Sequence, residues 1–236
     1  MDVTEQQLFD YLQCPVYYDI TVNKKLPSEQ PVQLSDLLMK VTRFFYLQLS
    51  LGEVPTLATL KRKWDMVFQP YQEILGEKKA IEGLQLLMKL YDWAKETKLV
   101  VIDIDSPYAI TSGKNKLEGV MGVIAAGKNG RDELLVTSFS PRMSHEDLDA
   151  LKLKYTIDSY AYRLKYGKDL SGIRIHHVKH GKDSLTFRKN SDYERLFGTI
   201  NGVCKSLENN IYYVRDHYGC AICPVNNLCK YWFNNY

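Results

Sequence analysis

The chain has 236 residues, enough to bury the core of one large domain, and its 31 basic and 28 acidic residues give a formal charge of only +3. This weak positive field permits a nucleic acid as partner but does not demand one. Aromatic residues make up 12% of the chain, which indicates an ordered globule, and the longest apolar runs fall short of the ~18 residues that would cross a membrane.

The first predicted element is a helix over residues 4–12, with Thr4 as its N-cap and Leu8, Tyr11 and Leu12 on one side. It leads directly to Cys14, which is followed by proline. Residues 21–33 contain two prolines and mixed charges, so they are expected to form a loop.

Residues 30–98 are predicted to form a helical insertion. Ser35 is expected to cap a helix that Gly52 ends, Thr56 to cap the next helix, and a third helix to cover 78–98. The basic run Lys61, Arg62 and Lys63 lies in the second of these helices and is a candidate for phosphate contact, although a solvated helix face is the simpler interpretation.

After Lys98 the apolar pattern becomes extended, and turn residues such as Gly113 and Gly130 separate the runs. Short turns between successive strands favour antiparallel pairing. The expected strands cover 99–105, 108–110, 117–125 and 133–139.

The last third is expected to alternate between helices and strands. A helix over 146–166 precedes a strand pair at 172–179 and 184–188, and a helix over 192–209 leads to the tail, 210–236. Basic residues recur here, so Lys179 and Arg188 are further candidates for contact with a nucleic-acid backbone.

Cysteines are the most informative residues of the tail. Cys220, Cys223 and Cys229 follow the spacing C-x2-C-x5-C, and Cys14 supplies a fourth thiol near the start. Four soft thiolate ligands suit a [4Fe-4S] cluster or a structural zinc, and not magnesium or calcium. The lone distant cysteine is atypical of paired zinc knuckles and favours iron-sulfur over zinc.

Disulfides or ordinary small apolar residues are the alternative interpretation of these cysteines. The number of cysteines is odd, with Cys204 left over, and the chain opens with polar residues and no apolar leader. A secreted disulfide protein is therefore not expected. A reducing compartment fits better, namely the cytoplasm, or the host cytoplasm if the protein is viral.

The order of elements and the cysteine positions resemble the RecB-like branch of the PD-(D/E)XK nuclease superfamily. The resemblance is to its iron-sulfur members, such as AddB-type nuclease domains and CRISPR-adaptation exonucleases, and covers nearly all of residues 1–236 outside the insertion. It implies a single α/β domain, with a mixed sheet flanked by helices and a cluster that joins the two ends. It rests on Cys14-Pro15, the segment 117–124, the segment 160–164 and the terminal cysteines.

The same resemblance exposes a degenerate active site. The family's metal-binding Asp follows a glycine by three residues, and Gly122 stands there after Gly119. The family's next strand carries Asp or Glu and then Lys, where this chain is aligned with Thr137 and Phe139. Magnesium binds mainly through carboxylates and retained waters, so no magnesium is expected here and the family's catalysis is not expected.

Three functions stay open at this point. The leading one is a catalytically inactive, cluster-containing subunit that binds DNA or assembles into a replication, recombination or transcription complex. The second is an active metal-dependent DNase with relocated ligands, for which Asp105, Glu118 and Thr137 are the candidates. The third is a protein-interaction module that uses the former active-site groove, now carrying Phe139.

Overall fold

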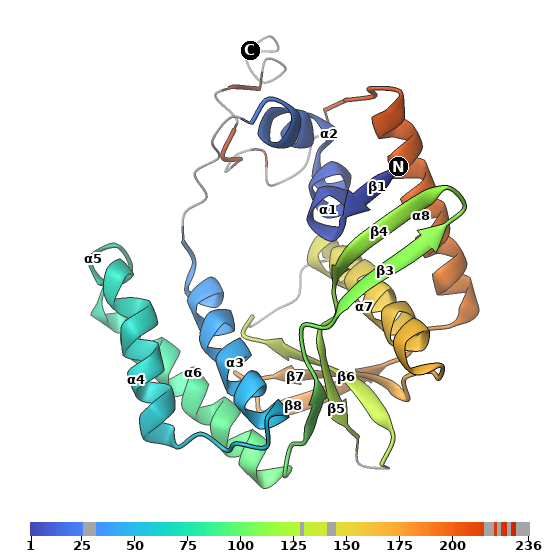
Figure 1. Cartoon of the computed structure of the whole chain (residues 1–236). Helices are drawn as coiled ribbons and strands as arrows, with labels where there is room; N and C mark the ends of the chain where they lie inside the picture. The colour runs from blue at the N-terminus through green and yellow to red at the C-terminus, as the bar shows by residue number, and fades with distance from the viewer. Residues whose placement is uncertain are drawn as a thin grey trace. The chain divides into compact units, whose positions relative to one another are not determined.

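The computed structural model describes residues 1–25, 32–127, 130–140, 145–214, 220, 223–225 and 228–229, except for the side chains of 145–151. The chain folds into two compact units (Figure 1). Unit 1 comprises residues 1–31, 107–119 and 190–236, and unit 2 comprises 32–106 and 120–189. In the described part of the chain, no helix combines the length and the apolar character that crossing a bilayer requires.

Unit 1 is a small sheet with helices from both ends of the chain. Its strands are ordered β1-β4-β3, and β1 runs parallel to β4, with Val3 opposite Leu117. Strand β1 was not predicted, because three residues carry too little pattern. The elements are β1 (Asp2–Thr4), α1 (Glu5–Gln13), α2 (Pro15–Tyr18), the π-helical turn Asp19–Asn23, β3 (Pro107–Ser112), β4 (Asn115–Val120) and α8 (Asn190–Glu208).

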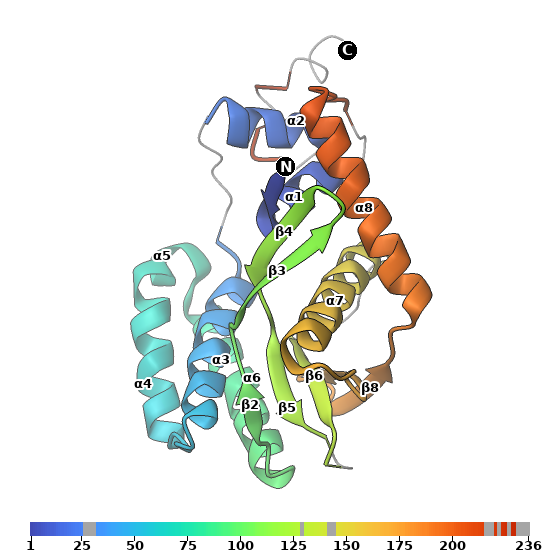
Figure 2. The same cartoon turned by 45° about the vertical axis from the view of Figure 1, so that its right-hand side comes forward.

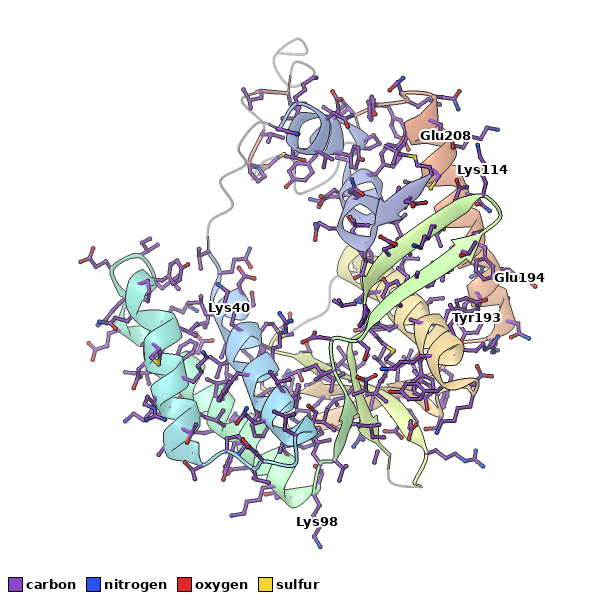
Figure 3. All side chains as sticks on the ribbon, in the orientation of Figure 1. Lys40, Lys98, Lys114, Tyr193, Glu194 and Glu208 are labelled. Carbon is purple, nitrogen blue, oxygen red and sulfur yellow. The ribbon has the colours of Figure 1, made fainter. Side chains whose placement is uncertain are left out.

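Local capping explains where α1 begins. The Thr4 side chain accepts from the Gln7 amide, and the Gln7 side chain accepts in return from the Thr4 amide, which confirms the predicted cap. At the other end of unit 1, Lys114 in the β3–β4 turn makes a 3.0 Å ion pair with Glu208 at the end of α8 (Figure 3). This pair is exposed, so it contributes little stability.

Unit 2 is a five-stranded mixed sheet of order β2-β5-β6-β7-β8. Strands β6 and β7 are parallel and the other neighbours are antiparallel. The strands are β2 (Val101–Asp103), β5 (Val123–Ala126), β6 (Asp132–Ser138), β7 (Gly172–His177) and β8 (Lys182–Thr186). The helices are α3 (Leu34–Ser50), α4 (Leu57–Phe68), the 3-10 turn Gln69–Tyr71, α5 (Gln72–Leu75), α6 (Glu77–Glu96) and α7 (His145–Tyr166).

Helices cover both faces of this sheet. Helix α7 lies on one face, and α3 and α6 lie on the other (Figure 2). The helices predicted as an insertion do not stand apart, because Leu38 and Leu90 share one buried core with Leu135 and Val178 of the sheet region. Residues 32–98 therefore supply 12 of the 17 buried residues of this cluster.

One predicted strand is divided in two. The run 117–125 was expected to be continuous, but it breaks at Met121 and Gly122 into β4 and β5, which belong to different sheets. The Met121 amide donates to the Ser106 carbonyl at this break. Apolar residues continue through the break, so the sequence pattern did not reveal it.

The packing of α4 on α6 depends on Gly83. A Cβ atom at this position would lie 2.2 Å from the Trp64 ring, and the Trp64 indole donates to the Ala80 carbonyl at 3.1 Å. Trp64 is only 2% exposed, and its ring would have to shift from this packed position to admit a methyl group at residue 83.

We expect Gly83→Ala to lower the free energy of unfolding by ~1–3 kcal/mol through overpacking, despite ~1 kcal/mol gained in helix propensity. Gly198→Ala is the matched control, because a Cβ at Gly198 of α8 would meet nothing within 4 Å. That change is expected to raise the free energy by ~0.5–1 kcal/mol. Urea denaturation measures both, and a stabilising effect of Gly83→Ala would contradict the packing described.

Candidate functional site

The four cysteines named from the sequence gather in unit 1. Cys14 lies between α1 and α2, and it packs with Cys223 against a small core of Tyr17, Ile20 and Val225. All four thiols are half-buried and none forms a disulfide. Residues far apart in the sequence, near both ends of the chain, thus supply one local group.

The electrostatics of this group centre on Cys223. Burial raises the pKa of the Cys223 thiol, and the nearby thiols of Cys14, Cys220 and Cys229 raise the pKa further. Each thiolate disfavours ionisation of its neighbours, so ionising all four requires a positive centre among them. A metal cofactor is the chemistry that this arrangement suits.

The spacing of the thiols bears on which cofactor fits. Among the described residues, no three potential ligands are grouped as they would be around one metal ion. A single zinc draws four sulfurs to ~2.3 Å of one centre, whereas a [4Fe-4S] cluster binds each thiolate through a different iron and so accommodates sulfurs farther apart. Either cofactor would be held by Cys14, Cys220, Cys223 and Cys229.

Gly122 lies on the face of the unit 2 sheet that α7 covers. A Cβ atom at Gly122 would be 3.0 Å from Asp158 Oδ2 and 3.3 Å from Leu134 Cδ1. Strand residue Leu134 pairs with Ile124, so both of these side chains also point to this face, which we call the α7 face. The Asp158 carboxylate of α7 therefore lies beside Gly122, the residue that precedes β5.

Thr137 and Phe139 lie on the opposite face, beneath α3 and α6. Thr137 Oγ1 is 2.5 Å from the Tyr46 hydroxyl of α3, and Phe139 is part of the buried core that includes Leu135. Side chains alternate along a strand, so these positions cannot join Gly122 in one site. The prediction that placed Thr137 and Phe139 beside Gly122 is wrong in this respect, and Ser138 alternates to the α7 face.

Burial of Phe139 also removes one alternative. The side chain is 8% exposed and is enclosed by core residues of α3 and α6. The expectation that Phe139 occupies an open groove is therefore wrong. The physical reason is that the helices of residues 32–98 cover the face to which Phe139 points.

A polar row crosses the sheet at Thr137. His176 of β7 is the register partner of Thr137, and Asp183 of β8 is the register partner of His176. The His176 ring stacks on Trp93 of α6 at 3.8 Å, and its Nδ1 lies 2.7 Å from Asp183 Oδ1. Burial lowers the pKa of His176, so the ring is neutral here and serves the packing of α6 on the sheet.

The relocated acids considered from the sequence already have partners. Asp105 has a positive φ of 56° and pairs with Arg43 at 2.6 Å. Glu118 belongs to unit 1, where it pairs with Lys116 of the same strand. The structure does not bring a group of carboxylates to Asp105 or Thr137 within unit 2, as far as its described residues show.

Asp103, the neighbouring acid on β2, is held by α7. Its carboxylate accepts from Lys165 and Tyr166 at 2.7 Å and from Ser106 at 2.6 Å. Burial opposes ionisation of Asp103, but these hydrogen bonds outweigh burial and keep its pKa below the ordinary value. This carboxylate is structural.

Asp158 and Lys154 were not singled out from the sequence. They lie one turn apart on α7, with Lys154 Nζ 2.7 Å from Asp158 Oδ1 and 3.1 Å from the Val120 carbonyl. Asp158 is 3% exposed, whereas the Lys154 side chain is 28% exposed. The only sequence signal was their i, i+4 spacing, which is common on solvent-exposed helix faces.

The five basic residues that were candidates for nucleic-acid contact fall into two groups, those that are exposed and those that contact other residues. Lys61 and Arg62 are exposed on α4, whereas Lys63 lies 5.3 Å over the Phe44 ring. Lys179 pairs with Glu82 at 3.2 Å, and the Arg188 guanidinium donates to the Phe187 carbonyl at 2.9 Å and lies over Tyr155. The structure does not gather these five residues into one continuous patch on a single element.

Comparisons with known proteins identify the fold but no family. No family model matches the sequence, and no curated protein matches it. The crystal structure of a "Putative exonuclease" from Eubacterium rectale matches with a TM-score of 0.56 at 9% identity, over 99% of this chain and 87% of that chain. The crystal structure of SSO0001 matches with a TM-score of 0.40 at 13% identity, over 96% and 93% of the two chains.

The first of these likenesses covers the whole architecture, so the chain is an α/β protein with a fold similar to that of the E. rectale protein. The nuclease-like fold predicted from the sequence is thereby supported, and the mixed sheet flanked by helices is confirmed.

Restoring a carboxylate at Gly122 is expected to destabilise the protein. Gly122→Asp places a second carboxylate beside the buried Asp158, and like charges raise the pKa of at least one of them. We expect Gly122→Asp to cost ~1–3 kcal/mol more than Gly122→Asn at pH 7.

The stability difference between Gly122→Asp and Gly122→Asn should depend on pH. A raised folded-state pKa destabilises the protein above the unfolded pKa of about 4, so the difference between Gly122→Asp and Gly122→Asn should vanish as pH falls below that value. Urea denaturation at several pH values tests this. Equal stability of the two variants at pH 7 would show that Asp158 is not beside Gly122.

Proposed function

We propose that this chain is a catalytically inactive protein of nuclease-like fold that holds a [4Fe-4S] cluster and acts as a DNA-binding or assembly subunit. The observation that carries the proposal is the contrast between two sites. Four thiols gather around Cys223, whereas the sheet position expected to hold a catalytic carboxylate is Gly122. The thiols support the proposed cluster, and the glycine supports the proposed lack of catalysis.

The cluster would be held by Cys14, Cys220, Cys223 and Cys229. When bound, it supplies a rigid cationic centre that satisfies four thiolates. The chain's own contribution is to bring the ligands together, which the core of Tyr17, Ile20 and Val225 does for Cys14 and Cys223. Ligation would close a loop of about 200 residues, so it would restrict the unfolded chain and stabilise unit 1.

The residues of the α7 face support the proposed lack of catalysis. The family mechanism needs two carboxylates and a lysine that surround a magnesium ion, and here Gly122 and Ser138 offer no carboxylate on the strands. The one carboxylate beside them, Asp158, is buried and paired with Lys154. We therefore infer that magnesium is not bound and that nucleic acid is not cleaved.

Nucleic acid is nevertheless the proposed ligand class. The E. rectale protein of similar fold is described as an exonuclease, and Lys61 and Arg62 are exposed cations on α4. A protein partner within a larger complex is the alternative role of the same inactive fold. Location in the cytoplasm remains part of the proposal, because four free thiols persist in a reducing compartment.

An active nuclease with relocated ligands is the second candidate. Asp158 and Lys154 at Gly122 are the observation that favours it, because they supply a carboxylate and a lysine where the family needs them. The earlier candidates, Asp105, Glu118 and Thr137, do not support it, since each is engaged elsewhere.

Cofactor analysis tests the cluster. Protein purified without oxygen is expected to contain about four irons and four sulfides per chain, and Cys14→Ser, Cys220→Ser, Cys223→Ser and Cys229→Ser should each lose most of the iron and lower the melting temperature. Cys204→Ala is the matched control, because Cys204 is buried in α8 outside the group. Zinc in place of iron, or full iron in Cys14→Ser, would refute the proposed ligation.

DNA assays test the rest of the proposal. We expect no cleavage of labelled single-stranded or duplex DNA with magnesium or manganese. DNA affinity should fall ~tenfold between about 50 and about 200 mM salt, as ~2 phosphate contacts require. Cleavage that Asp158→Asn abolishes would establish the second candidate instead. Absence of DNA binding at low salt would leave assembly with a protein partner as the role.

A further inference from the structure

The chain turns sharply where α8 ends. Asn210 has a positive φ of 52°, the left-handed conformation in which helices commonly end. The Asn210 amide donates to the Leu207 carbonyl at 3.1 Å. The Ile211 amide donates to the Ser206 carbonyl at 2.9 Å. These two hydrogen bonds form a Schellman motif, so the direction in which the chain leaves α8 is fixed.

Three tyrosines contact one another directly after this turn, and we call Tyr11, Tyr18 and Tyr212 the tyrosine cluster. The Tyr11 hydroxyl donates to the Ile211 carbonyl at 2.7 Å. The Tyr212 ring stacks on the Tyr18 ring with centroids 6.4 Å apart, and it lies 6.5 Å from the Tyr11 ring. The rings of Tyr11 and Tyr18 meet edge to face at 5.8 Å, and the Asn23 amide donates to the Tyr212 hydroxyl at 2.9 Å. The segment that follows α8 is thus held against α1 and α2.

The tyrosine cluster lies on both sides of Cys14 in the sequence. Tyr11 stands three residues before Cys14 and Tyr18 four residues after it, and both rings are buried. Aromatic pairs attract each other beyond the effect of the area they bury. Tyr212 stands eight residues before Cys220, and eight residues of chain reach at most ~28 Å. The ring contacts therefore limit the distance over which the terminal cysteines must meet Cys14.

We propose that the members of the tyrosine cluster are positioning residues for the cofactor ligands, because they hold the chain that follows α8 against the helices on either side of Cys14. This inference deepens the proposed function and rests on it, since it takes the four cysteines as the ligands. The ring contacts and hydrogen bonds belong to the protein itself, so the cofactor would not have to supply the free energy of ordering residues 211–213. Pre-organised ligands hold a metal more tightly than ligands on a free segment do, so the tyrosines slow the release of the metal.

Release of metal to a chelator tests this role in the full-length protein as purified. Iron and zinc are both measured, so the result does not depend on which of them is bound. Tyr212→Ala removes two ring contacts and should speed release ~tenfold. Tyr213→Ala is the matched control, because Tyr213 is 56% exposed and takes no part in these ring contacts, and it should change release less than ~twofold. Tyr212→Phe keeps the ring and should return release to within ~threefold of the natural rate.

Tyr11→Phe is a second test that keeps the buried ring and removes only the hydroxyl that binds the Ile211 carbonyl, and it should speed release ~threefold. After the metal has been released, mild oxidation of the same samples should join Cys14 to a terminal cysteine ~tenfold more slowly in Tyr212→Ala than in the natural protein, because the effective concentration of the thiols is lower.

An unchanged cross-linking rate in Tyr212→Ala, an equal effect of Tyr213→Ala, or no effect of Tyr11→Phe on either rate would overturn the inference. A natural protein that holds no metal would refute the proposed cofactor, and the cross-linking rates would still decide the role of the tyrosines. Failure of the inference is therefore distinguishable from failure of the proposed function.

Discussion

The alternation of side chains along β6 constrains the whole of unit 2. Both faces of the sheet are covered by helices, so each β6 residue belongs to one of two packed layers and cannot serve the other. Leu135, Thr137 and Phe139 are committed to the layer of α3 and α6, whereas Leu134 is committed to the layer of α7. Any site that includes Gly122 must therefore be built from the α7 face, where Asp158 and Lys154 of α7 lie.

A different constraint holds unit 1 together. Its three chain segments are separated by the sequence of unit 2, and the cluster of buried residues near Cys14 is small: Tyr17, Ile20 and Val225. Cys14 and Cys223 pack against this small cluster, and other buried residues of unit 1, such as Leu8 and Ile200, do not belong to it.

The sequence predicted the elements well where local chemistry decides them. Thr4 and Thr56 cap helices as expected, each accepting a hydrogen bond from an amide of the first turn, and all the long helices are present. The break between β4 and β5 was missed because Val120, Met121 and Val123 continue the apolar run. Tertiary pairing into two sheets, which no local pattern encodes, decides that break.

The site was harder to predict than the fold for a related reason. β6 reads Leu134-Leu135-Val136, apolar on both faces, so its phase cannot be taken from hydrophobic alternation. Moving a strand by one residue turns every side chain to the other face, so the sequence could not show that Thr137 lies opposite Gly122. The burial of Asp158 could not be predicted for another reason. Its i, i+4 spacing from Lys154 is the same whether the helix face is buried or exposed to solvent.

Several basic residues in the second half of the chain form ion pairs with acidic residues of unit 2. Asp103, Asp132 and Glu133 each pair with a lysine or arginine from α7, the segment after it, or β7. Hydrogen bonds from Lys168 and Tyr162 hold the pKa of Asp132 below its ordinary value, so the Asp132 carboxylate offsets the charge of Lys168.

The local excess of lysine and arginine that the sequence shows is thus largely internal to unit 2. A phosphate backbone responds to uncompensated charge, and Lys61 and Arg62 on α4 make no ion pair with the described residues. Lys61 and Arg62 therefore differ from Lys165, Lys168 and Arg174, whose charges are offset by neighbouring acids.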